Sequence, residues 1–207
     1  MLVEKSVRDL LDAFASSAPT PGGGSAAALA SATGAALLEM VAGLPKTRSN
    51  SDDDRAALVA AAGVLTRVRS QLTEAIDADS GAYDQVVAAF KLSKATDAEK
   101  SARKHAVQRA LRAATDVPLG VARLSVDALK QAQAVAGHGH SGASSDVGVA
   151  IALLVAGQRG ALLNVRINLE GITDAAYVSA VRVEMERLAV AASAAAQASE
   201  ALLGSST

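Results

Sequence analysis

The sequence predicts an all-α fold, a multihelical array whose long helices form a helical-bundle dimer. Apolar residues recur at three- and four-residue spacing along most of the chain, and no stretch alternates apolar and polar residues as a strand does. Half of the 207 residues are hydrophobic but only 2% are aromatic, so small and aliphatic side chains must build the core. Long alanine-rich helices leave more apolar surface than a monomer of this size buries, which indicates a homodimer. We expect one domain covering residues 1–207.

The first two of six predicted helices flank a glycine-rich stretch. The first covers about residues 3–15 and carries an apolar stripe of Val7, Leu10, Leu11 and Phe14. The second covers about residues 25–44, because it follows three consecutive glycines and is followed by Pro45.

The two central helices are predicted to be the longest. One covers about residues 53–92 and starts behind the polar run "SNSDDD". The next opens at Thr96 with the capping-box pattern "TDAE" and reaches about residue 135. Pro118 lies inside this helix and is expected to kink or interrupt it, because proline cannot donate the helical hydrogen bond.

The last two helices follow the clearest loop of the chain, "AGHGHSGASS". The fifth covers about residues 146–170 and ends at Gly171. The sixth starts at Thr173 and Asp174, runs to about residue 203 and precedes a frayed "GSST".

Composition and charge exclude several classes of function. The 20 basic and 21 acidic residues give a net charge of −1, which argues against binding of nucleic acid or an anionic membrane. The absence of cysteine excludes disulfides and thiol catalysis, and no histidine spacing forms a metal motif, so we expect no metal. No apolar run approaches the roughly 20 residues of a membrane span, and the N-terminus has no signal core. We therefore expect a cytoplasmic protein.

The stretch "PTPGGGSAAA" is the first candidate for a binding site. Gly22, Gly23 and Gly24 lead into a helix, whose first backbone N–H groups are free and whose glycines allow a ligand to approach closely. Ser25 follows, placed to cap the helix or to hold a polar ligand group. A flexible helix start remains the alternative, although one glycine would suffice for a turn.

An aspartate lies on an apolar stripe of the third predicted helix. At three- and four-residue spacing the stripe comprises Leu72, Ile76, Asp79, Tyr83, Val87 and Phe90. A carboxylate facing the core is costly unless it is paired or functional, and desolvation raises its pKa into a range that suits a general acid or base. The alternative for Asp79 is a salt bridge to an arginine. Asp77 points away from this stripe, and for it a solvated position is equally compatible with the sequence.

The fifth predicted helix carries a polar line. Asn164 and Asn168 lie one turn apart in an apolar helix, where they need hydrogen-bond partners such as another helix or a polar heterocycle. Asp146 lies in the first turn, directly after Ser145, where the helix dipole already favours a carboxylate.

Five segments in this order resemble the cyclodeaminase/cyclohydrolase family. They are "PTPGGGSAAALASATGAALLEMVAGL", "DADSGAYDQVVAAFKLSK", "VPLGVA", "SDVGVA" and "NVRINL". This family comprises the C-terminal half of formiminotransferase-cyclodeaminase and free-standing bacterial relatives, including methenyltetrahydrofolate cyclohydrolases. The resemblance covers nearly the whole chain and implies an all-helical fold that dimerises through a helical hairpin.

The resemblance implies folate one-carbon chemistry. A cyclodeaminase closes formimidoyl-tetrahydrofolate to the methenyl form and expels ammonia, whereas a cyclohydrolase adds water to the methenyl carbon and opens the ring. Both reactions transfer protons around a tetrahedral carbon, and the family implies no cofactor beyond the tetrahydrofolate substrate. The residues do not distinguish the two activities.

The family pattern also implies roles for individual residues. Asp79 matches its recurrent acid and is the first candidate for proton transfer, with Asp77 as the second. The residues implied to bind the substrate are Gly22, Gly23, Gly24, Ser25, Lys94, Ser145, Asp146, Asn164 and Asn168. Among these, Lys94 would contact a folate carboxylate, and Ser145 and Asp146 would bind the pterin.

One departure from the family pattern concerns charge. The chain has "PKTRSN" where many members carry a basic run, so Lys46 and Arg48 alone would supply charge for a polyglutamate tail. The alternative function is a helical binding or assembly module that keeps the scaffold without turnover. Apolar residues at Asp79 and at the glycines would suit such a module better.

Overall fold

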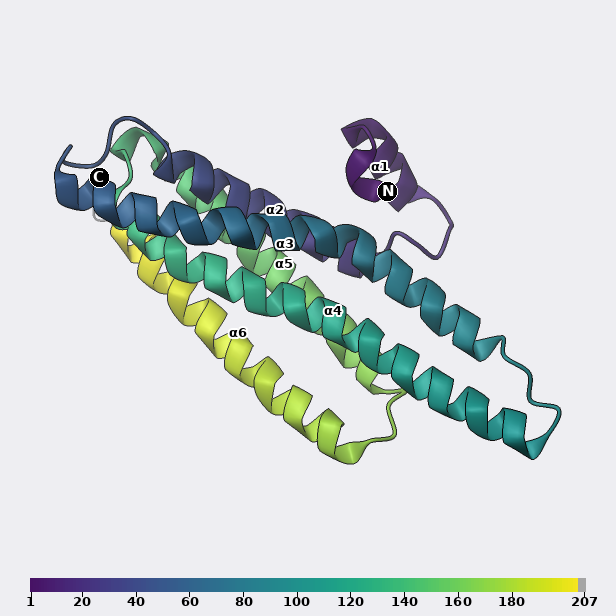
Figure 1. Cartoon of the computed structure of the whole chain (residues 1–207). Coiled ribbons are helices and arrows are strands. Elements are labelled where there is room, and N and C mark those ends of the chain that lie inside the picture. Colours follow the sequence, from purple (N-terminus) through teal and green to yellow (C-terminus); the bar gives the residue numbers. More distant parts are fainter. Residues whose placement is uncertain (205–207) are drawn as a thin grey trace.

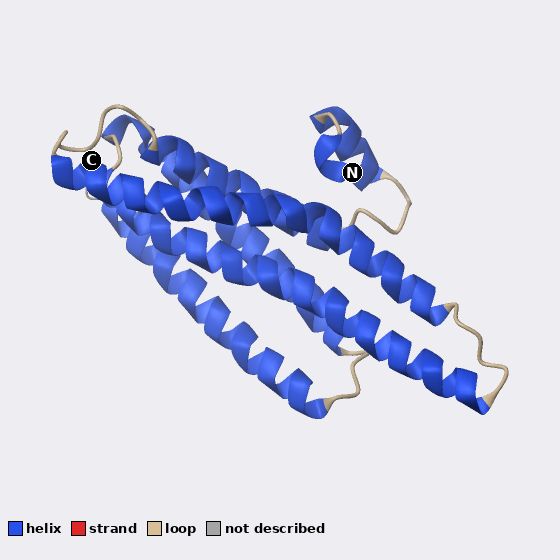
Figure 2. Ribbon diagram, in the orientation of Figure 1, coloured by secondary structure: helices blue, strands red, loops and turns tan. Residues whose placement is uncertain are grey.

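The computed structural model describes residues 1–204, and it is helical almost throughout (Figure 2). The elements are, in chain order, η1 (Leu2–Glu4), α1 (Val7–Ala15), α2 (Gly23–Ala42), α3 (Asp52–Phe90), α4 (Asp97–His138), η2 (Ser141–Ala143), α5 (Ser144–Leu169) and α6 (Ala175–Gly204). No strand occurs in the described range, which confirms the predicted all-α class.

The five long helices, α2 to α6, pack side by side as a bundle (Figure 1). Helix α2 contacts α3 and α5, and α4 contacts α3, α5 and α6. The α3–α4 hairpin projects beyond the ends of α2 and α5 (Figure 1). Helix α1 stands apart from this bundle and buries none of its residues (Figure 1).

The observed helix limits lie within a few residues of the prediction, with three corrections. The first predicted helix is divided, because Ser6 caps α1 by accepting a hydrogen bond from the Asp9 N–H and separates it from η1. Helix α2 begins at Gly23, so Ser25 lies inside its first turn and does not cap it. Gly137 and His138 belong to α4, not to the loop. Of the predicted frayed end, Gly204 closes α6 and residues 205–207 lie outside the described range.

Helix α4 runs through Pro118, so the interruption considered from the sequence does not occur. Proline leaves the carbonyl four residues earlier, that of Ala114, without its helical donor. The side chain of Asn168 on α5 fills this role, since its Nδ2 donates to the Ala114 carbonyl at 2.7 Å. A hydrogen bond between two helices therefore compensates for the proline.

Two glycines allow α2 and α5 to approach closely. A Cβ on Gly157 would overlap Ser31 Oγ and lie 2.6 Å from the Ala27 carbonyl, and a Cβ on Gly34 would lie 2.8 Å from the Ala150 carbonyl. These contacts show that α2 and α5 are antiparallel, because the early residues of α2 meet the late residues of α5. The N-terminus of α2 thus lies beside the C-terminal half of α5.

The expectation that no segment matches a membrane span needs correction. Gly23–Ala42 and Ser141–Leu169 are long and apolar enough by length and composition. Alanine, glycine and serine interrupt the strongly apolar residues in both segments, so neither has a long continuous apolar run. The mean hydropathy is nevertheless 1.4 for the first segment and 1.5 for the second. Helix α2 is 56% buried over its window, as in the core helix of a bundle, while the α5 window is only 39% buried.

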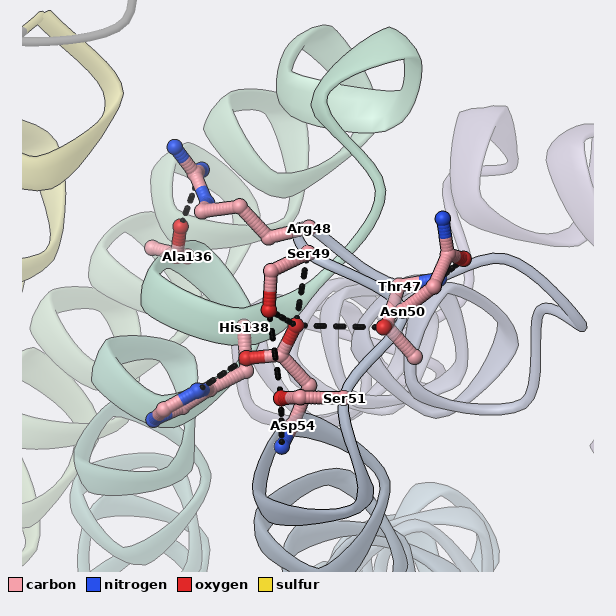
Figure 3. A network of polar contacts seen from close by, with 8 residues as sticks. All are labelled: Thr47, Arg48, Ser49, Asn50, Ser51, Asp54, Ala136 and His138. Carbon is pink, nitrogen blue, oxygen red and sulfur yellow. Dashed lines mark hydrogen bonds and ion pairs between the residues drawn. The ribbon is translucent and has the colours of Figure 1, made fainter.

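A buried carboxylate holds one end of the bundle together (Figure 3). Asp54, at the start of α3, is 6% exposed. It accepts hydrogen bonds from the Ser49 N–H and hydroxyl, both at 2.7 Å, and from the Thr47 hydroxyl at 3.1 Å. His138 Nδ1, at the end of α4, lies 2.8 Å from the other carboxylate oxygen. The loop after α2, the start of α3 and the end of α4 are therefore joined at Asp54.

This cluster predicts an acid-dependent loss of stability. Hydrogen bonds from His138 and then Ser49 hold the pKa of Asp54 far below its ordinary value. Because the folded pKa lies below the unfolded one, the carboxylate stabilises the fold fully above the unfolded value of 3.8 and loses this effect as the pH falls. We expect Asp54→Asn to unfold at lower urea concentration than wild type at about pH 7, with the difference narrowing at about pH 3. Circular dichroism would measure both midpoints, and a difference independent of pH would contradict the prediction.

Candidate active site

A cleft of about 300 Å³ opens where α2 begins, over the α3–α4 hairpin. Four helices and the segment before α2 contribute to it, so residues far apart in the sequence share one cavity. Its lining comprises Pro19, Thr20, Gly22, Gly23, Gly24, Asp79, Tyr83, Val86, Leu111, Ala114, Asn164 and Asn168.

The cleft lining contains one carboxyl group, that of Asp79, and burial removes it from solvent. Burial raises the pKa of Asp79, and hydrogen bonding from Ser25 partly opposes this rise. Ser25, which is fully buried, donates from its hydroxyl to Asp79 Oδ2 at 3.0 Å and lies 3.2 Å from the Ser80 hydroxyl. No arginine or lysine pairs with Asp79 among residues 1–204, so the salt bridge considered from the sequence is not found. The carboxyl group is therefore held by a neutral donor, next to an open cavity.

The glycines bring the backbone of α2 against this carboxyl group. A Cβ at Gly24 would overlap Asp79 Oδ1, so only glycine leaves room for the side chain there. A Cβ at Gly23 would lie 3.5 Å from Asn164 Nδ2, an ordinary contact, and Gly22 is the N-cap of α2. Close packing against Asp79 therefore explains why position 24 is glycine. Gly22 and Gly23 have no such contact, and they line the cleft with their backbone.

The two asparagines form the opposite wall, and each has the partner that burial demands. Asn164 Nδ2 donates to the Gly160 carbonyl one turn earlier at 2.9 Å. Asn168 Nδ2 donates to Ala114, as described above. Each amide nitrogen thus makes one hydrogen bond within the protein, and neither Oδ1 accepts a hydrogen bond from residues 1–204.

Sequence reasoning missed several lining residues. The sequence analysis treated Tyr83, one turn after Asp79, only as a member of the apolar stripe. In the structure Tyr83 is 42% exposed and lines the cleft. The stripe is buried at Leu72 and Ile76 and emerges into the cleft after Asp79. The sequence gave no indication that Leu111 and Ala114 on α4 line a cleft, because an apolar residue in a helix can equally well belong to the core.

Five of the candidate residues do not line the cleft, and one of them is Ser25, which lies buried behind Asp79. Asp77 accepts hydrogen bonds from the backbone N–H groups of Leu2, at 2.5 Å, and Val3, at 3.4 Å, and so fastens the N-terminal turn. Lys94 lies in the loop after α3. Ser145 and Asp146 lie at the start of α5, 19 and 18 residues before Asn164, which is about 27 to 29 Å along the helix. This separation follows from the helical rise, so two motifs on one helix could not be expected to meet in one cleft of a single chain.

Known proteins resemble the chain over nearly its whole length. A model of the family described as formiminotransferase-cyclodeaminase matches residues 6–187. Methenyltetrahydrofolate cyclohydrolase of Methylorubrum extorquens is 40% identical over 194 residues, which are 94% of this chain and 93% of the relative. Formimidoyltransferase-cyclodeaminase of Sus scrofa is 34% identical over 90% of this chain but only 35% of its own length. The crystal structure of formiminotetrahydrofolate cyclodeaminase from Thermotoga maritima superposes with a TM-score of 0.87 at 25% identity and covers 99% of this chain and 98% of that one.

Proposed function

The chain belongs to the formiminotransferase-cyclodeaminase family, and from that premise we propose that it is a methenyltetrahydrofolate cyclohydrolase. The single observation that carries the proposal is the carboxyl group of Asp79, desolvated beside an open cleft and bound to a neutral hydroxyl. The similarity to the cyclohydrolase of Methylorubrum extorquens over both whole chains supports this choice of reaction.

In the proposed reaction the carboxylate of Asp79 acts first as a base. Water attacks the methenyl carbon, and Asp79 takes one of its protons, which leaves a tetrahedral carbon bearing a hydroxyl group. The protonated Asp79 then returns its proton to N5 as the bond from N5 to this carbon breaks. The hydroxyl group loses its proton and becomes the formyl oxygen on N10. One water is consumed, one proton is released, and the carbon keeps its oxidation state, so the proposal calls for no metal or redox cofactor.

The other lining groups suit a flat polar heterocycle. The acceptor oxygens of Asn164 and Asn168 face N–H donors of a pterin, and Tyr83 offers an aromatic face at the mouth of the cleft. The backbone of Gly22, Gly23 and Gly24 allows the ring to approach closely. We propose that the protein acts in the cytoplasm as a homodimer.

A second candidate is the cyclodeaminase reaction, favoured by the similarity to the Thermotoga maritima protein. N10 of formimidoyl-tetrahydrofolate attacks the carbon of the protonated formimidoyl group, whose nitrogen becomes an amino group, and N10 loses its proton to Asp79. Asp79 then protonates the amino group, the carbon–nitrogen bond breaks, and ammonia leaves. The same carboxyl group serves both reactions.

A side-by-side assay tests the proposal. We expect purified protein to accelerate the loss of methenyltetrahydrofolate absorbance over the buffer rate, and to do so with a higher kcat/KM than it shows for ammonia release from formimidoyl-tetrahydrofolate. The reverse order would make the chain a cyclodeaminase. Acceleration of neither reaction would refute the enzymatic proposal and favour a binding or assembly module.

The role of Ser25 predicts a shift in the pH profile. Its hydroxyl stabilises the charged form of Asp79, so Ser25→Ala is expected to raise the pKa of that carboxyl group further. Because the base must be ionised, the acid limb of kcat/KM should move to higher pH by about 0.5–1 unit. The matched control is Ser80→Ala, whose hydroxyl contacts Ser25 but not Asp79 and should shift the limb less. Equal shifts in both variants would contradict this role.

A further inference from the structure

A groove runs between α5 and α6, on the side of α5 that faces away from α2. It consists of two adjoining cavities of about 400 and 430 Å³, which share Leu162, Arg166 and Ala189 in their linings, and we call it the α5–α6 groove. Gly157 contacts α2, whereas Arg159 in the groove lies about 200° around the helix from it. Among residues 1–204 the groove and the candidate active site share no lining residue. The groove is therefore a second concave surface, separate from the cleft.

Each wall of this groove contains a line of four residues with the spacing of a helix–helix contact. On α5 the line is Val155, Arg159, Leu162 and Arg166. On α6 it is Arg182, Glu186, Ala189 and Ser193. Both lines repeat at four, three and four residues, which is the period by which one helix packs along another. Each line spans about three helical turns, so the two walls match the length and period of a third helix lying between them.

The middle of the groove is apolar and leaves room for a large side chain. Leu162 lines both cavities from α5, and Ala189 lines both from α6. The neighbouring positions on the α6 wall are also small, since Ala192 and Ser193 follow at the next turn. A large apolar side chain from outside would therefore bury its surface against Leu162 and fill the space above the alanines.

Three exposed arginines line the groove and form no ion pair within residues 1–204. They are Arg159, Arg166 and Arg182. Glu186 also lines the groove and is likewise unpaired in that range. Arg159 and Arg166 are seven residues apart, which places them about 10 Å apart along α5. The positive charge is thus repeated along the groove and is complementary to carboxylates that lie two turns apart on an opposing helix.

A buried donor in the groove lacks an acceptor. Gln158 lines the groove next to Arg159 and is 2% exposed, yet its Nε2 has no hydrogen-bond acceptor among residues 1–204. An unpaired buried donor costs free energy, so an occupant that brings an oxygen atom to this amide is favoured. This observation is independent of the arginines and also indicates an occupant with acceptor groups.

We propose that the α5–α6 groove binds an acidic amphipathic helix of a partner protein. The helix presents a large apolar side chain to Leu162 and Ala189, and it presents carboxylates two turns apart to Arg159 and Arg166. The spacing of the arginines favours this occupant over a fatty acid, because one carboxylate cannot reach two guanidinium groups about 10 Å apart along the helix. The proposal does not depend on the proposed enzymatic function.

Two synthetic peptides test the groove directly. The acidic probe is a fluorescein-labelled helical peptide of about 18 residues, with leucines along one face and glutamates seven residues apart beside them. The basic probe has lysine at each glutamate. In fluorescence anisotropy we expect wild type to bind the acidic peptide at least about tenfold more tightly than the basic one, since lysine would meet the arginines with like charge. A smaller ratio, or binding that does not saturate, would overturn the proposal.

A double charge reversal locates the binding. Arg159→Glu combined with Arg166→Glu is expected to weaken binding of the acidic peptide at least about tenfold. The matched control combines Arg67→Glu and Arg109→Glu, which make the same change of net charge at exposed positions of α3 and α4 outside the groove. This control should bind like wild type, and circular dichroism checks that both variants fold. Equal weakening in the two double variants would mean that only net charge matters, and the proposal would fail.

Sedimentation and vesicle binding distinguish other occupants of the groove. We expect the Arg159→Glu and Arg166→Glu double variant to keep the oligomeric state of wild type in sedimentation velocity. A wild-type oligomer that this variant dissociates would place a second copy of the chain in the groove and overturn the proposal. Wild type that binds phosphatidylglycerol vesicles more tightly than the acidic peptide would overturn it in favour of a membrane. Folate turnover enters none of these measurements, so a failure of the proposed function leaves their result unchanged.

Discussion

Asp79→Asn is expected to lower kcat for the preferred folate by about 10²–10⁴-fold, which is the usual contribution of a positioned general base. Asparagine has nearly the same shape and still accepts the hydrogen bond from Ser25, so the fold should be unchanged. The side chain would, however, no longer accept a proton from water or return it to nitrogen. Stopped-flow absorbance of the methenyl form measures this loss, and circular dichroism checks the fold.

Two other aspartates of α3 serve as controls for this result. Asp84 lies one turn beyond Ser80, is exposed and does not line the cleft. Asp84→Asn should therefore keep the wild-type rate. Asp77→Asn should loosen the N-terminal turn, because two backbone hydrogen bonds are weakened, and should leave the proton transfer in place. An Asp79→Asn enzyme with more than about a tenth of the wild-type rate would move the base to another group.

Gly157→Ala is expected to destabilise the fold by about 1–3 kcal/mol through overpacking. The added Cβ would overlap the Ser31 hydroxyl and lie 2.6 Å from the Ala27 carbonyl and 3.0 Å from the Ser31 N–H nitrogen, so backbone as well as side-chain atoms must move. Since this contact joins α2 to α5, the two walls of the cleft would shift together. Urea unfolding at constant pH measures the loss.

Gly63→Ala is the matched control, and we expect it to change the free energy of unfolding in the opposite direction. Gly63 is an exposed position within α3, and a Cβ there would meet no atom within 4 Å. The substitution should stabilise the protein by about 0.8–1 kcal/mol, because alanine has a higher helix propensity than glycine. If both variants changed the urea midpoint in the same direction, close packing would not be the reason for Gly157.

Periodicity predicted the helices and Asp79 because both are local properties of the chain. The spacing of Leu72, Ile76 and Asp79 is sufficient to place the carboxylate on an inward-facing stripe, and its raised pKa follows from that burial. The hydrogen bond from Ser25 to Asp79 could not be predicted from the sequence. The two residues are 54 positions apart, and only the packing of α2 on α3 brings them together. The interpretation of Ser25 as a cap was wrong for the same reason: its hydroxyl turns toward another helix.

The separation of Asp146 from Asn164 was open to prediction from the sequence. Both residues were placed on one helix, and the helical rise over 18 residues puts them about 27 Å apart along its axis. The uninterrupted course of α4 through Pro118 was not predictable in this way, because the Asn168 side chain that donates to the Ala114 carbonyl is 50 residues further along the chain.

The double use of Asn168 limits how this cleft can change during evolution. One amide both lines the cavity and supplies the donor that Pro118 denies to Ala114. A mutation at position 168 that altered substrate preference would at the same time leave a buried carbonyl unsatisfied in the middle of α4. Such a change becomes tolerable only after Pro118 is replaced by a residue with a backbone N–H. The order of mutations, and not only their sum, would thus decide which descendants of this protein remain folded.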